Sequence, residues 1–315
     1  MGKRVLIALG GNAIKQPDEW GAAEEQMRNV SVACRQIAEI ARRGYEVAIT
    51  HGNGPQVGNL SIQQEQARHL VPPQPLVILG AMTQGQIGYM IQQSLRNQLA
   101  GDGRQVVTII TQVVVDRDDP DFEDPHKPIG PFYTEEEAER LGAEKGWTFR
   151  MVRPSSDRPW RRVVPSPEPL GIVEGEGIKR MIDAGMIVIA SGGGGVPVVV
   201  DGSGRLEGVD AVVDKDLAGA VLAEEVDADI LLILTDVDGV KLDYGRPTER
   251  AITHVTADRA RAYMREGHFP PGSMGPKVEA CIRFVEGGGE GAVIASLEGA
   301  IEALEGRAGT LITRG

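Results

Sequence analysis

Three lysines stand in segments that restrict where their ammonium groups can point. Lys127 lies in His-Lys-Pro-Ile-Gly-Pro-Phe, Lys215 in Val-Asp-Lys-Asp, and Lys277 in Gly-Ser-Met-Gly-Pro-Lys. The glycines, prolines and flanking aspartates limit the local backbone and side-chain geometry. Lysine is the minority choice in this chain, with 8 lysines against 25 arginines. Because an ammonium group is a compact charge that can be aimed at phosphate oxygens, these lysines indicate phosphoryl chemistry.

Glycine clusters follow three of the strand-like apolar runs. The segments are Leu9-Gly10-Gly11-Asn12, His51-Gly52-Asn53-Gly54-Pro55 and Ser191-Gly192-Gly193-Gly194-Gly195. Glycine allows the backbone to approach a ligand closely and to expose N–H groups to an anion. One such pair is equally well explained as an ordinary turn. Three clusters at three strand ends favour a shared site, because ligands bind at the carboxyl edge of open parallel sheets.

Two of the lysines stand at predicted helix starts. Asp214 is a candidate N-cap, so Lys215 falls in a first helical turn, where the helix dipole disfavours a cation. A local cost without packing gain points to function, although a surface lysine neutralised by Asp214 and Asp216 is the plain alternative. Pro276 suits an early helical position and places Lys277 beside free backbone N–H groups, which favours an anion site.

The segment Leu234-Thr235-Asp236-Val237-Asp238-Gly239-Val240 ends another predicted strand. Its threonine and two acids suit the hydroxyl groups of a ribose or the outer shell of a metal. The remaining ligands of a calcium loop are missing from the sequence that follows. Among the histidines, His51 is the most interesting by position, and no Cys/His spacing indicates a zinc site.

Several common signatures are missing from the sequence. No Walker pattern occurs, and after His51-Gly52-Asn53-Gly54 the next glycine is Gly58, one position too late for a dinucleotide fingerprint. Protein-kinase motifs and a nucleophile elbow are also missing. A nucleotide would therefore be bound on another scaffold.

Composition narrows the class of protein. The 315 residues are 41% hydrophobic and 25% charged, which is ordinary for a globular chain. A net charge of −12 argues against a nucleic-acid partner, and no apolar run is long enough to predict a membrane span. Cys34 and Cys281 lie in amphipathic helical patterns, so we expect both to be buried thiols in a reducing cytoplasm.

Strand-like runs alternate with longer amphipathic stretches, which predicts a parallel sheet covered by helices on both faces. The expected strands are 5–9, 45–50, 106–115, 186–190, 197–200, 230–234, 292–295 and 309–313. The expected helices are a stretch of about two dozen residues ending near Gly44, then a stretch that follows Pro55 and continues to about Leu70, and the segments 80–99, 174–184, 214–226, 274–286 and 298–304.

The stretch 116–169 breaks this rhythm. It is rich in proline, aspartate, arginine and aromatic residues. Only 134–145 reads as a helix, and 147–152 reads as a strand. We interpret it as an ordered insertion that protrudes from the main sheet.

Five segments together closely resemble the carbamate kinases of the amino-acid-kinase family. They are 8–13, 51–58, 127–132, 214–216 and 272–277, and the likeness extends over essentially the whole chain. The first segment, like Leu-Thr-Asp-Val-Asp-Gly, is shared widely in the family. Lys-Pro-Ile-Gly-Pro-Phe and His-Gly-Asn-Gly-Pro-Gln-Val-Gly are what single out the carbamate kinases.

The resemblance implies one domain, 1–315, built as a three-layer αβα sandwich with a mainly parallel central sheet. A lobe of about 1–210, including the insertion 116–169, would hold carbamate or carbamoyl phosphate. A lobe of about 211–315 would hold ATP or ADP with Mg²⁺. The resemblance also implies a homodimer and a reversible reaction that runs toward ATP in arginine breakdown. No residue is assigned as a direct metal ligand.

Roles for individual residues follow from the resemblance and the local chemistry. Lys215 and Lys277 would neutralise the transferring phosphoryl group, Asp216 would orient Lys215, and Lys127 would close over the substrate. Residues expected to bind the substrate are Gly10, Gly11, Asn12, Gly52, Asn53, Gly54, Gly193 and Gly194. Residues expected to bind the nucleotide are Asp214, Thr235, Asp236, Val237, Tyr244, Met274 and Gly275.

Two other hypotheses remain open at this point. An amino-acid kinase for a larger carboxylate would have a roomier pocket and should lack the Lys127 motif. A non-catalytic regulator on the same fold should have lost a lysine or Asp216. A coupled assay for ATP formed from carbamoyl phosphate separates them.

Overall fold

A computed structural model describes residues 2–269 and 272–315. Its centre is an eight-stranded sheet in the order β15-β17-β16-β12-β1-β2-β9-β3. All neighbouring pairs in it are parallel except β16 and β17. The strands are β1 (Arg4–Leu9), β2 (Glu46–His51), β3 (Val106–Thr108), β9 (Ile187–Ile189), β12 (Ile230–Thr235), β15 (His254–Thr256), β16 (Gly291–Ser296) and β17 (Thr310–Thr313).

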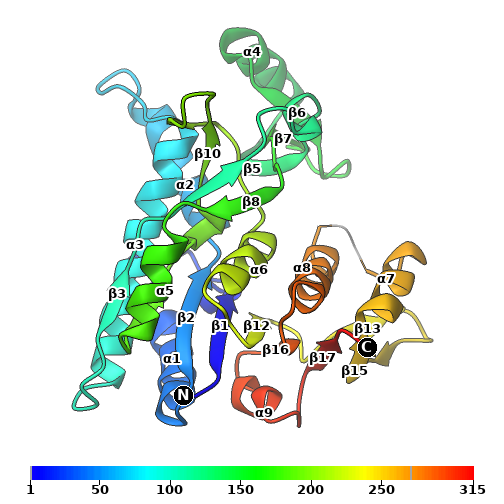
Figure 1. Cartoon of the computed structure of the whole chain (residues 1–315). Coiled ribbons are helices and arrows are strands. Elements are labelled where there is room, and N and C mark those ends of the chain that lie inside the picture. The colour runs from blue at the N-terminus through cyan, green and yellow to red at the C-terminus, as the bar shows by residue number, and fades with distance from the viewer. Residues whose placement is uncertain (1, 270–271) are drawn as a thin grey trace.

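Helices cover both faces of this sheet, as Figure 1 shows. Side chains of β1 alternate between two cores, with Val5 and Ile7 on one side and Leu6 and Ala8 on the other. One face is covered by α1 (Ala23–Arg42), α3 (Leu76–Gln98) and α9 (Ala300–Leu304). The other is covered by α5 (Gly175–Asp183), α6 (Lys215–Glu225), α7 (Ala257–Arg265) and α8 (Met274–Glu286). The predicted three-layer sandwich is therefore confirmed.

Smaller sheets extend this core. A four-stranded sheet has the order β11-β10-β4-β8, with β4 (Gln112–Val115), β8 (Pro169–Ile172), β10 (Val196–Val200) and β11 (Leu206–Gly208). A short pair joins β13 (Lys241–Leu242) and β14 (Arg250–Ala251). Helix α2 (Gly54–Ala67) follows β2 and leads toward α3.

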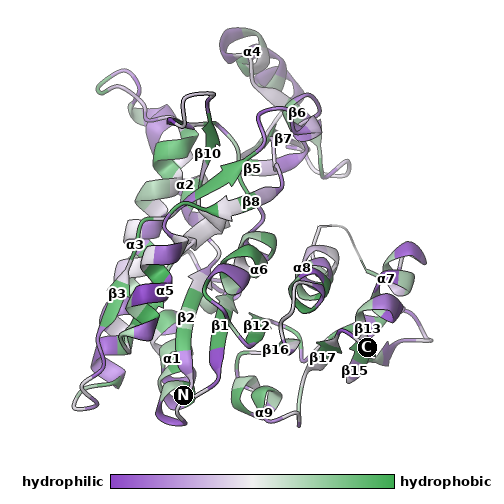
Figure 2. Cartoon of the chain, viewed as in Figure 1, coloured by the Kyte–Doolittle hydropathy of each residue, from purple (hydrophilic) through white to green (hydrophobic). Residues whose placement is uncertain are grey.

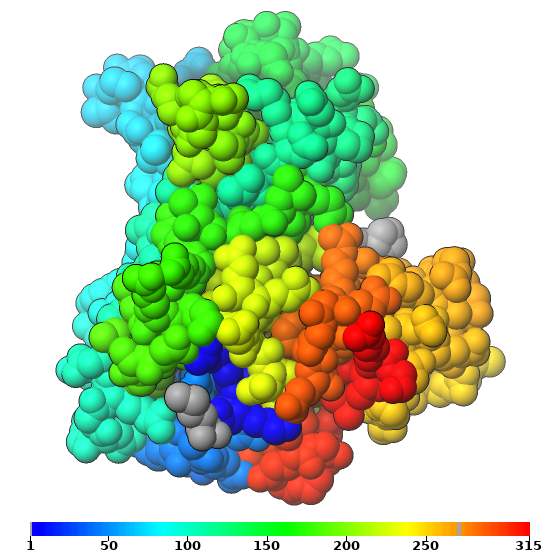
Figure 3. Space-filling model, viewed as in Figure 1, coloured from blue at the N-terminus to red at the C-terminus, as the bar shows by residue number. Residues whose placement is uncertain are grey.

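The insertion is ordered, as predicted from its aromatics. Its sheet has the order β5-β7-β6, from β5 (Lys127–Tyr133), β6 (Thr148–Met151) and β7 (Trp160–Val164), and it carries α4 (Glu135–Lys145). It lies at the opposite end of the molecule from the C-terminal segments (Figure 3). Its α4 surface is more polar than the strands of the central sheet (Figure 2).

Some expected elements were wrong in detail. The apolar run 106–115 is two strands in different sheets, because the chain turns at 109–111 and Gln84 pairs with both the N–H and the carbonyl of Thr111. The first helix begins only at Ala23. Helix α7 and strand β15 were not expected, since their residues are mostly only partly buried or exposed and are weakly patterned.

Both cysteines are buried, as predicted. Burial raises the pKa of the Cys34 thiol to about 12, so it is unreactive near neutral pH. Among the described helices, none combines the length and apolarity that a membrane crossing requires.

Candidate active site

The first turn of α6 organises the charged part of the site. Asp214 caps the helix, because its carboxylate accepts hydrogen bonds from the N–H groups of Asp216 and Leu217. The predicted N-cap is therefore confirmed. Asp216 is only 4% exposed. A buried carboxylate at this depth requires cationic partners.

All three predicted lysines converge on these two aspartates. The Nζ atoms of Lys215 and Lys277 contact different oxygens of Asp216, the second at 3.1 Å. The Nζ of Lys127, on β5 of the insertion, lies 3.0 Å from the other carboxylate oxygen of Asp214. The insertion and two separate helix starts thus meet at one point.

Asp216 stays ionised between its two lysines. Burial would raise the pKa of its carboxyl, but the charges and hydrogen bonds of Lys215 and Lys277 outweigh that effect and hold the pKa below its usual range. Counting the three lysines against Asp214 and Asp216 leaves one net positive charge. An incoming phosphate would therefore meet ammonium groups that are already in position and whose positive charge the two aspartates neutralise only in part.

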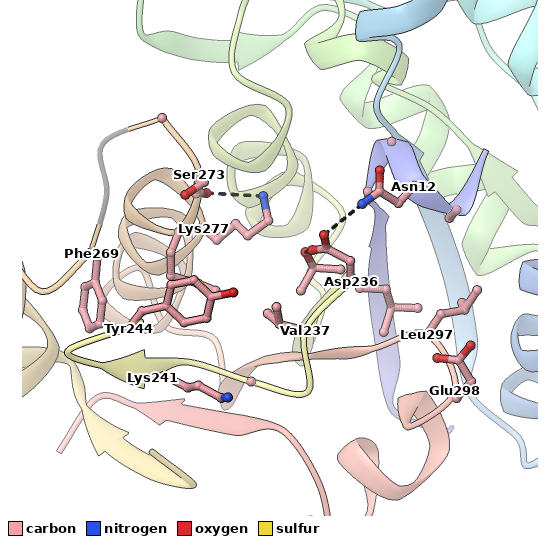
Figure 4. A pocket seen from close by; sticks show the side chains of 18 of the residues that line it. Asn12, Asp236, Val237, Lys241, Tyr244, Phe269, Ser273, Lys277, Leu297 and Glu298 are labelled. Atoms are coloured by element: carbon pink, nitrogen blue, oxygen red, sulfur yellow. Dashed lines mark hydrogen bonds between the residues drawn. The ribbon is translucent and has the colours of Figure 1, made fainter. Parts of the chain in front are cut away.

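A cleft of about 600 Å³ opens beside Lys277. In Figure 4 the side chains of Lys277, Asp236, Tyr244 and Asn12 surround it. The Nδ2 of Asn12 donates to Asp236 at 3.0 Å, which links the loop after β1 to the loop after β12. The cleft is lined by Gly10, Gly11, Asn12, Ala13, Gln16, Leu234, Thr235, Asp236, Val237, Gly239, Lys241, Tyr244, His268, Phe269, Gly272, Ser273, Met274, Lys277, Leu297 and Glu298.

Most residues predicted to bind nucleotide line this cleft. They are Thr235, Asp236, Val237, Tyr244 and Met274. Asp214 and Gly275 do not line it. Both oxygens of Asp214 are already engaged, one by the α6 backbone and one by Lys127, so its place is among the charged groups.

The glycine loops pack against one another next to the lysines. A Cβ placed on Gly52 would lie 3.5 Å from the Gly11 backbone and 3.7 Å from the Lys215 side chain. On Gly193, which has φ +67°, a Cβ would lie 2.2 Å from the Asn53 amide. Gly11, Gly52 and the Lys215 side chain are therefore close neighbours, as are Gly193 and Asn53, whereas Gly10, Gly11 and Asn12 line the cleft.

Neutral hydrogen bonds hold this half of the site. The Thr50 hydroxyl donates to the Ser191 carbonyl at 2.8 Å, and the Ser191 N–H donates to the Thr111 hydroxyl at 2.9 Å. The Nδ2 of Asn53 donates to the Thr83 hydroxyl at 2.9 Å. Thr50, Thr83, Thr111 and Ser191 are completely buried.

His51 lies under the glycine loops at the end of β2 and is 1% exposed. A Cβ on Gly192 would collide with its ring. Burial, opposed by a hydrogen bond with the Gly52 carbonyl and aided by the charge of nearby Lys215, lowers the pKa of His51 to about 4. The ring is neutral at physiological pH and acts here as a spacer between two loops.

Comparison with known proteins identifies the family. Residues 3–296 match the model of the Amino acid kinase family. A carbamate kinase of Pyrococcus furiosus is 58% identical, over 99% of this chain and 99% of that protein. One of Pyrococcus horikoshii is 56% identical, over 99% of this chain and 100% of that protein.

The chain belongs to the carbamate kinases of the amino acid kinase family.

Solved structures of carbamate kinases share its fold. Carbamate kinase from Giardia lamblia bound to AMP-PNP is 44% identical and superposes with a TM-score of 0.93, covering 99% of this chain and 98% of that one. The predicted family, enzyme class and sandwich fold are confirmed by these likenesses. The site described above is therefore the site of a carbamate kinase family member.

Sequence reasoning missed the buried threonines and Ser191. Thr83 lies inside helix α3, where a single hydroxyl indicates no more than an ordinary packed residue. Ser191 takes a left-handed φ of +51°, which no local residue pattern announces. Only its place at the head of a glycine loop could have drawn attention to it.

Proposed function

We propose that this carbamate kinase transfers a phosphoryl group reversibly between ATP and carbamate, giving ADP and carbamoyl phosphate. The observation that carries the proposal is the meeting of Lys127, Lys215 and Lys277 on Asp214 and Asp216. This cluster adjoins a nucleotide-sized cleft, which Lys277 lines, and the close-packed residues around Asn53. The Lys127 motif disfavours a kinase for a larger carboxylate, and the complete lysine set disfavours a non-catalytic regulator.

Charge neutralisation and alignment suffice for this reaction. The attacking carbamate oxygen is already anionic, so no general base is required. Lys215 and Lys277 would move their hydrogen bonds from Asp216 to the phosphoryl oxygens as negative charge spreads there. Asp216 would hold the two ammonium groups at a fixed separation before the substrate arrives. The reverse reaction uses the same contacts.

The neutral pocket would hold the carbamoyl group. Gly52, Gly193 and Gly194 allow the surrounding loops to pack closely, and Asn53 supplies an amide side chain. Donors from Gly11 and Asn12 would meet the phosphoryl group from the cleft side. The Gly10 N–H, also predicted as a donor, instead donates to the Leu234 carbonyl at 2.9 Å. Because His51 is neutral, no additional cation competes with the lysines for the phosphoryl group.

The cleft would hold ATP or ADP along Thr235, Asp236, Val237, Tyr244 and Met274. The AMP-PNP of the Giardia lamblia carbamate kinase supports a nucleotide role for this family member. Hydroxyl groups of a ribose would meet the Thr235–Asp236 pair, and Tyr244 would lie beside the base.

Magnesium would accompany the nucleotide. Within residues 2–269 and 272–315, no group of three His, Cys, Asp or Glu side chains is placed to hold a metal. The cleft does carry the carboxylates of Asp236 and Glu298. These residues fit an ion that is held mainly by phosphate oxygens and water, with Asp236 orienting its water shell. When bound, Mg²⁺ neutralises charge on the β and γ phosphates.

The division into lobes of about 1–210 and 211–315 remains part of the proposal. The central sheet runs through both parts, since β1, β2, β9 and β3 come from the first and β12, β16, β17 and β15 from the second. Lys127 reaches Asp214 across that boundary. The insertion would therefore close the carbamoyl pocket by bringing Lys127 onto the start of α6.

A second copy of the chain is the proposed partner. On α3, Ile78 and Met82 are 42% exposed and Tyr89 is 57% exposed, all on one helix face. They lie near the free edge of the central sheet at β3. Met82→Glu should convert a dimer to a monomer in sedimentation experiments, whereas a monomeric parent protein would refute the interface.

The remaining expectations concern cellular context. Two buried thiols suit a reducing cytoplasm. Operation toward ATP in arginine breakdown is supported only by the family resemblance. The central test is ATP formation from ADP with carbamoyl phosphate, N-acetylglutamyl phosphate or acetyl phosphate. We expect carbamoyl phosphate to be strongly preferred, and inactivity with all three would reject the proposed reaction.

A further inference from the structure

Asn53 occupies a capping position without capping. It is the N-cap residue of α2, yet its side chain makes no capping hydrogen bond with that helix. Asparagine is favoured at N-caps because its oxygen normally accepts an N–H bond there. Another interaction therefore determines the direction of this amide.

The Asn53 amide instead contacts Thr83, and the hydroxyl of Thr83 determines which end of the amide faces it. The Thr83 hydroxyl donates its single hydrogen to the Gly80 carbonyl at 2.7 Å. It can then only accept from Asn53, so it must meet the amide NH₂, and the distance to Nδ2 is 2.9 Å. The reverse orientation would bring two acceptors together. Thr83 is completely buried, so water cannot substitute for it.

The other end of the amide is consequently left as an acceptor. Gly193 packs closely against the whole amide group and limits its rotation. Within the part of the chain that the structure describes, no donor is hydrogen-bonded to Asn53 Oδ1. Its neighbour Gly52 lies between Gly11 and Lys215. A fixed, unused carbonyl oxygen thus lies beside the proposed phosphoryl site.

We propose that Thr83 is a positioning residue for substrate selectivity. By holding Nδ2, it makes Asn53 present Oδ1 to the amino group of the carbamoyl moiety. An acetyl group has a methyl at that place and cannot donate, so Oδ1 would lose its water without gaining a partner. Sites built around a substrate N–H discriminate strongly against analogues that lack it. This inference rests on the proposed carbamate kinase reaction.

Thr83→Val tests the idea, because valine keeps the shape and removes the hydroxyl. The assay measures kcat/KM for ATP formation from ADP with carbamoyl phosphate and, separately, with acetyl phosphate. We expect Thr83→Val to lower the carbamoyl phosphate value about tenfold, the loss of roughly one hydrogen bond. The acetyl phosphate value and the KM for ADP should stay near those of the parent enzyme. Thr83→Ser should restore the parent ratio.

Thr108→Val is the matched control. The Thr108 hydroxyl is also buried, but it has no hydrogen-bond partner and lies on β3, away from Asn53. In Thr108→Val, the ratio of kcat/KM for carbamoyl phosphate to kcat/KM for acetyl phosphate should equal that of the parent enzyme. If Thr83→Val does not fold by circular dichroism, Thr83→Ala provides the same comparison.

Different outcomes test the positioning role of Thr83 and the proposed reaction. An equal fall with both substrates in Thr83→Val, or no fall with carbamoyl phosphate, would overturn the positioning role while leaving the reaction intact. A parent enzyme that forms no ATP from carbamoyl phosphate would instead overturn the proposed function itself.

Discussion

The two halves of the candidate active site are held together by different interactions, ion pairs in one and neutral hydrogen bonds with close packing in the other. On the phosphoryl side, three ammonium groups meet two carboxylates at the start of α6. On the carbamoyl side, His51, Asn53 and Thr83 are neutral and tightly enclosed. The first half holds charge that can be redistributed when a phosphate arrives. The second half holds a shape, since Asn53 Nδ2 is bound to Thr83 and the glycine loops pack closely around it.

This difference predicts different responses to substitution. A charged cluster should lose catalytic rate when one ammonium is removed, because the transition state carries the charge that it neutralises. A close-packed neutral pocket should respond to volume and to protonation. The experiments below are arranged by the size of the effect that we expect.

Lys215→Ala should have the largest effect. Removing this ammonium should lower kcat by about a thousandfold, the upper range for the loss of one preorganised electrostatic contact. Steady-state ATP formation from ADP and carbamoyl phosphate measures it. Lys179→Ala is the control, since Lys179, on α5, pairs with Asp183 and with Asp227, outside the site. Near-normal turnover in Lys215→Ala would remove the charged half from the mechanism.

Gly193→Ala should disrupt the neutral half of the site, because the added methyl has no space there. The added methyl would lie 2.2 Å from the Asn53 amide at a φ of +67°. We expect kcat/KM for carbamoyl phosphate to fall about a hundredfold, because displacement of about 1 Å costs that much. Left-handed strain should also lower the free energy of unfolding by about 1–2 kcal/mol.

Gly204→Ala separates these two contributions. Gly204 has a φ of +82° in the β10–β11 hairpin, but a Cβ there would have no atom within 4 Å. It should share the loss of stability, measured by urea unfolding, and keep the catalytic efficiency. Equal activity of the two variants would show that the contact with Asn53 is unimportant.

Protonation of His51 should weaken the fold in mild acid. Its folded pKa of about 4 lies below its ordinary value of 6.5, so the unfolded chain binds the extra proton first as the pH falls. The free energy of unfolding should therefore decrease by about 2 kcal/mol between roughly pH 7.5 and about pH 5. The low pKa of Asp216 adds its own loss only at more acidic pH.

The variant His51→Gln reports this contribution. Its free energy of unfolding, from urea titrations at several pH values, should depend much less on pH over that window. His254→Gln should retain the parent slope, since His254 is exposed and contacts Thr313. An unchanged slope in His51→Gln would show that another group titrates.

Lys127→Ala should have the smallest effect of the series. Lys127 is 35% exposed and pairs with Asp214 from the insertion, so its charge is partly screened. We expect about a tenfold rise in the KM for carbamoyl phosphate, the range of a charge-assisted hydrogen bond. The KM for ADP should not change. A matching rise in both values would show that the insertion acts on the whole site and not on the carbamoyl pocket alone.

The charged half was largely predictable from the sequence. Each of its lysines carries a local mark, namely a proline-glycine setting or a helix start flanked by acids. The glycine loops were likewise visible, because they follow apolar strand segments at regular points. These signals are local, and parallel strands bring their carboxyl ends to one edge in any fold of this class.

The residues that hold the neutral half of the site were largely not predictable from the sequence. Thr83 lies 30 residues from its partner Asn53, and Ser191 lies 80 residues from its partner Thr111. A local motif cannot express such pairs. A buried hydroxyl is meaningful only through the group that it meets. The split of 106–115 into two strands has the same origin, since the Gln84 side chain that holds the turn belongs to α3.

The sequence alone therefore determined the alternation of strands and helices, the glycine loops, the three lysines and the family that they resemble. Periodicity, helix-start chemistry and glycine freedom act over a few residues, so they can be read from neighbours in the chain. Tertiary structure decided that Lys127 reaches Asp214, that Thr83 turns the Asn53 amide and that His51 is kept neutral. Each of these depends on burial and on partners distant in sequence, which exist only after the chain has folded.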